Sequence, residues 1–320
     1  MKYDYLEKND LLINEAIKQY LDNIIKNNSL ANGYIFFGAE GIGKKETAIN
    51  FISRILKKRS SINNIYERIR NNNHPDFLVI KPTYLNRSNA KKNDSPKMRQ
   101  KDVEIIKVDQ IRNIRTFLGR KSIESEKKIV LIVDAHLLNE AASNCLLKTL
   151  EEPSNGIFIL LTSQISLLLD TVKSRCQLIR FSSFSRRKIE NILKDNLNPD
   201  CKILEKLNFQ DLVNLANGSP AKLLLTIEIW NEISDDIINK LDFPIKNNVE
   251  ILKISKSITE ELEIYQQICL IELLQHMWWG KTKSVILVKD LENIKSNLKN
   301  NIQPRLSWEV NLLKIGMEIK

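Results

Sequence analysis

The stretch between residues 128 and 176 restricts the fold of this chain more than any other. Ile129–Val133 is an unbroken apolar run rich in β-branched residues, the pattern of a strand buried on both faces of a sheet. A helical pattern follows, with Asn139 placed to cap its start and Pro153 to end it. A second apolar run, Ile157–Leu161, completes a strand–helix–strand unit. The pattern predicts an α/β fold with a parallel sheet.

Polar residues stand at the ends of these strands. Asp134 follows the first strand, and Thr162 follows the second. A third apolar strand, Tyr34–Phe37, is expected earlier in the chain and runs directly into a glycine-rich segment. In open α/β sheets, ligands bind at the carboxyl ends of the strands, so the sequence predicts a polar site at this edge.

The glycine-rich segment follows the pattern G-x-x-x-x-G-K of phosphate-binding loops. Gly38, Gly41 and Gly43 let backbone N–H groups converge on phosphates at a helix N-terminus, and Lys44 is placed to reach the terminal phosphates. The next residue departs from the pattern, because Lys45 stands where a Ser or Thr that ligates Mg²⁺ is expected. The sequence therefore predicts a nucleotide-binding loop with an impaired metal position.

Two further motifs carry a family resemblance. Leu146–Pro153 reads LLKTLEEP, and Ser174–Cys176 reads SRC. Together with the phosphate-binding loop, they resemble the clamp-loader subunits of bacterial DNA polymerase III, a family of AAA+ proteins, and within it the delta prime subunits most of all. The resemblance implies an α/β AAA+ P-loop αβα core with a parallel sheet over residues 1–182. A small helical lid over 183–232 and a C-terminal all-α collar domain for oligomerisation over 233–320 would follow.

The resemblance also implies roles for single residues. Asp134 corresponds to the acid that holds Mg²⁺ through water, and Arg175 to an arginine finger that acts in trans on a neighbouring subunit's nucleotide. An active AAA+ site follows its acid with a glutamate that polarises the attacking water, whereas this chain has Ala135. Ala221 stands where an active lid offers an arginine to the γ-phosphate. These departures imply a subunit that does not hydrolyse ATP, and they leave open whether ATP or ADP binds.

Two other interpretations stay open. A gamma/tau-type clamp-loader subunit that hydrolyses ATP would share the main motifs, although Lys45, Ala135 and Ala221 argue against it. A generic P-loop ATPase or a DNA-binding module outside replication would leave the motifs at Leu146–Pro153 and Ser174–Cys176 unexplained. ATPase activity of the purified single chain would favour either of these interpretations.

Partners and cofactors are also expectations from the resemblance. It implies assembly with delta and gamma/tau subunits in a hetero-pentamer of the DNA polymerase III holoenzyme, which contacts the sliding clamp and primer-template DNA. The family often carries a four-cysteine zinc module in the interval that corresponds to residues 51–73. This chain has no cysteine there, so we expect neither zinc nor another metal. His74, which has no neighbouring ligand residue in the sequence, is expected to be structural.

Composition sets broader limits. The formal net charge of +10 fits contact with nucleic acid, but it fits equally a lysine-rich surface. The basic, aperiodic segment 84–102 predicts a solvated surface insertion, with DNA contact as its alternative. No apolar run approaches the ~18 residues of a membrane span. The four cysteines are scattered, which favours a reducing cytoplasm.

Overall fold

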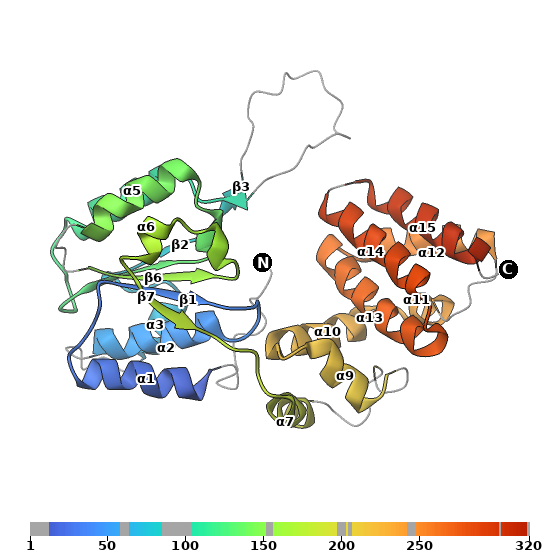
Figure 1. Ribbon diagram of the computed structural model, residues 1–320, viewed down its shortest axis with the longest axis horizontal. Coiled ribbons are helices and arrows are strands. Elements are labelled where there is room, and N and C mark those ends of the chain that lie inside the picture. Colours follow the sequence, from blue (N-terminus) through green and yellow to red (C-terminus); the bar gives the residue numbers. More distant parts are fainter. Residues whose placement is uncertain are drawn as a thin grey trace, which may run out of the picture. The chain divides into compact units, whose positions relative to one another are not determined.

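The computed structural model describes residues 13–57, 64–84, 104–151, 156–196, 203, 207–241, 247–300 and 302–318. The chain divides into two compact units, Met1–Phe184 and Ser185–Lys320. The first is an α/β unit and the second is helical (Figure 1). A separate boundary between lid and collar near residue 232 stays a prediction. Apart from Tyr84, the basic segment 84–102 lies outside the described residues, as do Glu152 and Pro153 of the LLKTLEEP motif.

The first unit is built on a five-stranded sheet in the order β2-β5-β6-β1-β7, in which all paired strands are parallel. The strands are β1 (Gly33–Phe37), β2 (Phe77–Ile80), β5 (Lys128–Ile132), β6 (Gly156–Thr162) and β7 (Gln177–Arg180). β3 (Thr83–Tyr84) and β4 (Glu104–Ile105) form a separate antiparallel ribbon. Every residue of β5 and β6 is buried, which confirms the prediction of strands buried on both faces.

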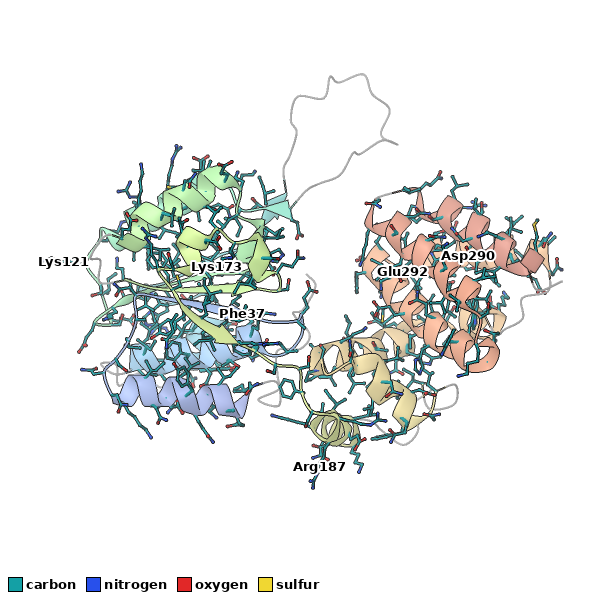
Figure 2. The ribbon with its side chains drawn as sticks, in the orientation of Figure 1. Phe37, Lys121, Lys173, Arg187, Asp290 and Glu292 are labelled. Carbon is teal, nitrogen blue, oxygen red and sulfur yellow. The ribbon has the colours of Figure 1, made fainter. Side chains whose placement is uncertain are left out.

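Helices cover both faces of this sheet. α1 (Glu15–Lys26), α2 (Lys44–Lys57) and α3 (Ile65–Arg70) lie on one face, and α5 (Glu140–Glu151) lies on the other (Figure 1). α4 (Val108–Leu118) packs against α5. Side chains from both layers fill the space against the strands (Figure 2). The predicted cap of α5 is confirmed, because the Ala142 N–H donates to Asn139 Oδ1 at 2.8 Å.

One predicted helix is wrong. The leucine-rich segment 166–172 indicates a single helix, but the structure has a 3₁₀ turn, η4 (Ile165–Leu167), followed by the one-turn α6 (Asp170–Lys173). The backbone is extended at Leu168 between them. Leu168 and Val172 are buried in the core, whereas Leu167 and Leu169 are exposed. Leu168 and Val172 are four residues apart, a spacing that one helical face would also bury, so burial alone does not tell the observed turn from a single helix.

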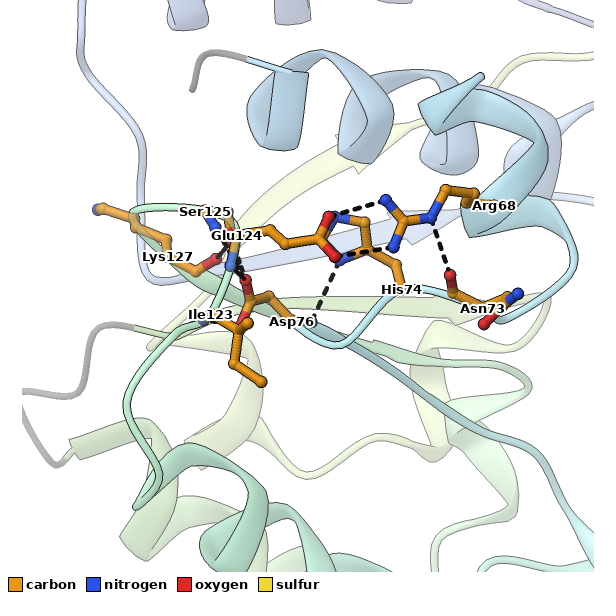
Figure 3. Close-up of polar contacts among 8 residues, drawn as sticks. All are labelled: Arg68, Asn73, His74, Asp76, Ile123, Glu124, Ser125 and Lys127. Atoms are coloured by element: carbon orange, nitrogen blue, oxygen red, sulfur yellow. Dashed lines mark hydrogen bonds and ion pairs between the residues drawn. The ribbon is translucent and has the colours of Figure 1, made fainter. Parts of the chain in front are cut away.

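A buried carboxylate fixes the entry to β2. The Asp76 side chain accepts hydrogen bonds from the N–H groups of Ile123, Glu124 and Ser125 and from the Ser125 hydroxyl, at 2.7–2.9 Å (Figure 3). Burial by itself would raise the pKa of Asp76, but these hydrogen bonds outweigh it and lower that pKa. Asp76 thereby joins the loop before β5 to the start of β2.

His74 completes this cluster. Its Nδ1 accepts the Asp76 N–H at 3.1 Å, and its Nε2 lies 3.6 Å from Glu124 Oε2 (Figure 3). Arg68 in turn donates to both oxygens of Glu124, at 2.7 and 2.9 Å. His74 is thus a packed, buried residue of the turn, and no metal-binding group of three His, Cys, Asp or Glu residues occurs in the described part of the chain.

The second unit contains only helices among its described elements. They are α7 (Arg186–Asn196), α9 (Phe209–Ala216), α10 (Pro220–Glu232), α11 (Asp235–Lys240), α12 (Asn248–Glu261), α13 (Ile264–Thr282), α14 (Val285–Lys299) and α15 (Pro304–Glu318). Trp278 is buried and donates to the Leu241 carbonyl at 3.2 Å, whereas the adjacent Trp279 is exposed. Asp290 and Glu292 mark α14 in Figure 2. None of the helices described has both the length and the apolar character that crossing a membrane requires.

Candidate nucleotide and subunit-contact sites

The phosphate-binding loop joins β1 to α2, as its sequence predicts. Gly38, Gly41 and Gly43 have φ values of 149°, 72° and 80°, which side-chain-bearing residues rarely adopt. A Cβ added to Gly38 would lie 2.3 Å from the Phe181 carbonyl oxygen. The loop therefore passes so close to the end of β7 that only glycine fits at residue 38.

Lys44 begins α2, and its side chain turns back into the loop. Its Nζ donates to the carbonyl oxygens of Gly38 at 2.7 Å and Ala39 at 2.5 Å. Burial lowers the pKa of Lys44, although Glu40 and Asp134 act in the opposite direction. These two carbonyls use two of the three donors of the ammonium, which leaves one N–H for a phosphate oxygen.

Asp134 lies two residues beyond β5, at the carboxyl edge of the sheet. Its backbone is left-handed, with φ and ψ both 50°, a region that Asp tolerates better than most residues. Burial raises the pKa of Asp134, while His136 and Lys44 pull it down. Asp134 and Lys44 thus influence each other's pKa, and their shared role in one site stays a prediction.

The residues that break the AAA+ pattern differ in their surroundings. Ala135 has no exposed surface and belongs to the core cluster that includes Ile106 and Leu146. A glutamate at residue 135 would bury an unpaired carboxylate, which is costly. Lys45 lies in the first turn of α2 and is half-buried. In the second unit, Ala221 is buried near the start of α10.

Arg175 lies in the turn between α6 and β7, on the surface of the first unit. Its Nη2 donates to Glu151 Oε1 at 2.5 Å, and its Nη1 donates to the Thr171 carbonyl at 2.9 Å. The side chain is 37% exposed. The neighbouring Cys176 points inward, where a Cβ on Gly33 would lie 2.6 Å from its Sγ, and burial raises the pKa of the thiol to about 11. Cys176 is partly buried.

Exposed leucines flank Arg175 in the sequence. Leu167 and Leu169 precede it and are 59% and 37% exposed, and Leu178 follows it and is 48% exposed. Leu178 belongs to β7, which ends the sheet and pairs only with β1 among the described strands. Exposed leucines and an arginine close together in sequence are candidates for a surface that contacts another protein.

Sequence reasoning missed two polar contacts at these sites. Glu151 belongs to the LLKTLEEP motif but was not singled out as the partner of Arg175, which is 24 residues away. His136 Nδ1 lies 3.3 Å from Thr162 Oγ1 and links the turn after β5 to the last residue of β6. The polar residue after each strand was the available signal, because parallel strand ends meet at one edge.

The sheet order, the P-loop between β1 and α2 and the acid after β5 define the class of AAA+ P-loop cores. In fold, the chain is similar to a DNA polymerase III gamma subunit-related protein from Thermotoga maritima, with a TM-score of 0.53 and 17% identity. That similarity covers 97% of this chain and 100% of the other, and it shows the fold alone.

Family comparison then gives the particular family. The model for "DNA polymerase III, delta subunit" matches residues 13–185, more than half of the chain. The model for "Cyanobacterial DNA polymerase III delta prime, C-terminal domain" matches residues 187–315. The chain therefore belongs to the DNA polymerase III delta prime family of clamp-loader subunits, which confirms the resemblance found in its motifs.

Similar proteins agree with this assignment. DNA polymerase III subunit delta' of Bacillus subtilis is 28% identical over 248 residues, which are 72% of this chain and 69% of that protein. Subunit delta' of Pseudomonas aeruginosa is 32% identical over 153 residues, 46% of this chain and 42% of that protein. Subunit gamma of Buchnera aphidicola is 33% identical over 149 residues, 46% of this chain and 40% of that protein. The last two alignments thus cover less than half of each relative.

Proposed function

We propose that this chain acts in the DNA polymerase III clamp loader as a subunit that does not hydrolyse ATP and supplies Arg175 in trans to a neighbour's ATP site. The observation that carries the proposal is the exposed guanidinium of Arg175 in the turn between α6 and β7, with exposed leucines on both sides. The absence of a hydroxyl at Lys45 and of a carboxylate at Ala135 accounts for the missing hydrolysis in this chain's own site.

The hydrogen bonds of Arg175 suit a finger. Two of its three nitrogens, Nη1 and Nη2, are held by groups of its own chain. Its Nε has no acceptor among the described residues, so part of the planar donor set is free to meet an incoming oxygen. A fixed guanidinium with unused donors is well placed to neutralise charge on a transferring phosphoryl group.

The chain's own P-loop lacks the parts that hydrolysis requires. Phosphoryl transfer depends on a correctly placed metal and on an oriented water. Lys45 cannot ligate Mg²⁺ through a hydroxyl, and Ala135 is buried in the core rather than directed at a water. The loop glycines and Lys44 are retained, so ATP or ADP bound without hydrolysis is part of the proposal.

Partners follow from the family. We propose assembly with delta and gamma/tau subunits in a hetero-pentameric, cytoplasmic complex that loads the sliding clamp onto primer-template DNA. Similarity to proteins named as delta' and gamma subunits supports the choice of partners. We assign the exposed leucines that precede and follow Arg175 in the sequence to the surface that contacts the neighbour whose ATP site receives the arginine.

The experiment is the clamp- and DNA-stimulated ATPase of the reconstituted loader containing this chain with Arg175→Ala. Arg112→Ala is the matched control, because Arg112 is an exposed arginine on α4, outside β7 and its exposed leucine. We expect the first variant to lower the rate by about tenfold or more, ~1.4 kcal/mol of barrier, with assembly intact. The ATPase rate of the loader with the control variant should stay within about twofold of the wild-type rate. Equal rates for the two variants would refute the role of Arg175.

A further inference from the structure

A small cavity lies next to the first turn of α2. Its volume is about 120 Å³, and residues of α2, α3, β2 and β5 line it, together with residues that directly follow three of these elements. Lys45 reaches it from α2, Arg70 from the end of α3, and Lys81 from the residue after β2. Helix α3 and the start of α2 are on the same face of the sheet (Figure 1).

The lining is one-sided in charge. Its charged residues are Lys45, Arg70 and Lys81, with no carboxylate, and apolar residues of α2, α3, β2 and β5 form the rest of the wall beside two asparagines. Arg70 has an ion pair with Glu67 at 3.9 Å, outside the lining. For Lys45 and Lys81, the described residues provide no salt bridge within 4.0 Å. Cationic side chains gathered at one cavity repel one another unless an anion joins them.

The position of the cavity connects it to the altered P-loop. Lys45 stands where a P-loop normally has the hydroxyl that holds Mg²⁺. Val133, which directly precedes Asp134, also lines the cavity. Lys45 thus brings a positive charge to the sequence position that holds the metal ligand in an active P-loop, and it also lines the cavity.

We propose that this cavity binds a phosphate-sized inorganic anion without a divalent metal. The volume of about 120 Å³ is well below the ~300 Å³ or more of sites for whole drug-sized ligands. The cavity thus admits a phosphate but not a nucleoside. Asn71 and Asn72, which also line it, offer neutral donors beside the three cations. This anion site is independent of the role assigned to Arg175.

The test is isothermal titration of the full chain with inorganic phosphate, once with EDTA and once with Mg²⁺. We expect binding in both, with Lys45→Gln weakening it at least about tenfold and Lys81→Gln at least about threefold. Lys57→Gln is the matched control, since Lys57 is an exposed lysine at the other end of α2, and should stay within about twofold. Lys45→Arg, which keeps the charge, should retain binding.

Lys44→Ala distinguishes phosphate binding in the cavity from phosphate binding in the P-loop. If the cavity takes free phosphate, this variant leaves phosphate affinity unchanged. If phosphate binds instead in the P-loop, Lys44→Ala removes binding and Lys45→Gln does not, which overturns the proposal. Binding that requires Mg²⁺, equal affinity in all variants, or no binding at ~10 mM phosphate would also overturn it. Lys81, an exposed residue after β2, keeps the test valid if a change at Lys45 disturbs folding.

Discussion

Nη2 of Arg175 lies 2.5 Å from Oε1 of Glu151, so the last residue of α5 holds the side chain that we propose as a finger. Both partners are exposed, at 37% and 53%. Ion pairs of this kind contribute only ~0–1 kcal/mol to folding. The contact is therefore more important for the direction of the guanidinium than for stability.

Replacement of this partner gives the first prediction. Glu151→Gln should lower the stimulated ATPase of the loader about two- to fivefold, because a neutral amide holds the guanidinium less firmly and orientation contributes to rate. The control is Asp170→Asn, which removes the Asp170–Lys173 ion pair of the same segment and should leave the rate unchanged. If Glu151→Gln has the same effect in an Arg175→Ala background as in the wild type, Glu151 does not act through Arg175.

A second prediction concerns the P-loop backbone. Gly38→Ala should lower the free energy of unfolding of the first unit by at least ~2 kcal/mol. The new Cβ would clash with the Phe181 carbonyl oxygen, and alanine is disfavoured at the φ of 149° that residue 38 adopts. Gly280→Ala, inside α13 with open space around it, should instead raise stability by ~0.5–1 kcal/mol. Calorimetry of both variants measures this, and a Gly38→Ala protein as stable as wild type would contradict the loop geometry.

The third prediction is a dependence on pH. Burial lowers the pKa of His74 below its usual 6.5, despite the opposing effect of Glu124. The folded state thus binds this proton less readily than the unfolded state, and stability is lost as pH falls below about 6.5. Hydrogen bonds hold the pKa values of Asp76 and Glu124 low, so further stability is lost in more acid solution.

Unfolding midpoints at pH 7.5 and 5.5 measure the histidine part of this effect. We expect a lower midpoint at pH 5.5 for the wild-type chain and a smaller difference for His74→Gln. The substitution also removes the acceptor of the Asp76 N–H, so the variant should be less stable at both pH values. An equal pH difference in the two proteins would show that His74 does not titrate as described.

A fourth prediction concerns hydrolysis by this chain. The purified single chain should have no ATPase above background, and Lys45→Thr should not create it. A hydroxyl at residue 45 restores a metal ligand, but Ala135 still leaves the attacking water without a carboxylate. Steady turnover of ATP by the wild-type chain, measured as phosphate release, would favour the gamma/tau-type interpretation.

The strands were predictable because central parallel strands are buried on both faces and read as continuous apolar runs. Ile129–Val133 and Ile157–Leu161 correspond to β5 and β6 within one residue at each end. The segment around Leu168 was not predictable, because leucines at 167–169 fit a helix as well as a turn. Only packing against the finished core decides that Leu168 is buried and Leu167 exposed.

In the candidate sites, too, features encoded by a local sequence pattern were predictable, and features that depend on packing were not. The P-loop follows from a local pattern, since its glycines and Lys44 are close in sequence. The Arg175–Glu151 contact depends on how α5 packs against α6, and no local pattern encodes it. The cavity at Lys45 joins four separate elements, so the sequence showed the departure at residue 45 but not the cations that accompany it.

The most direct test of the central proposal is the kcat and KM for ATP of the reconstituted loader with Arg175→Ala. An interaction made only in the transition state lowers kcat and kcat/KM together. We predict that kcat falls about tenfold or more while KM stays within about twofold, with the complex fully assembled. An unchanged kcat in the assembled complex would contradict the account and leave this chain without a part in its neighbour's chemistry.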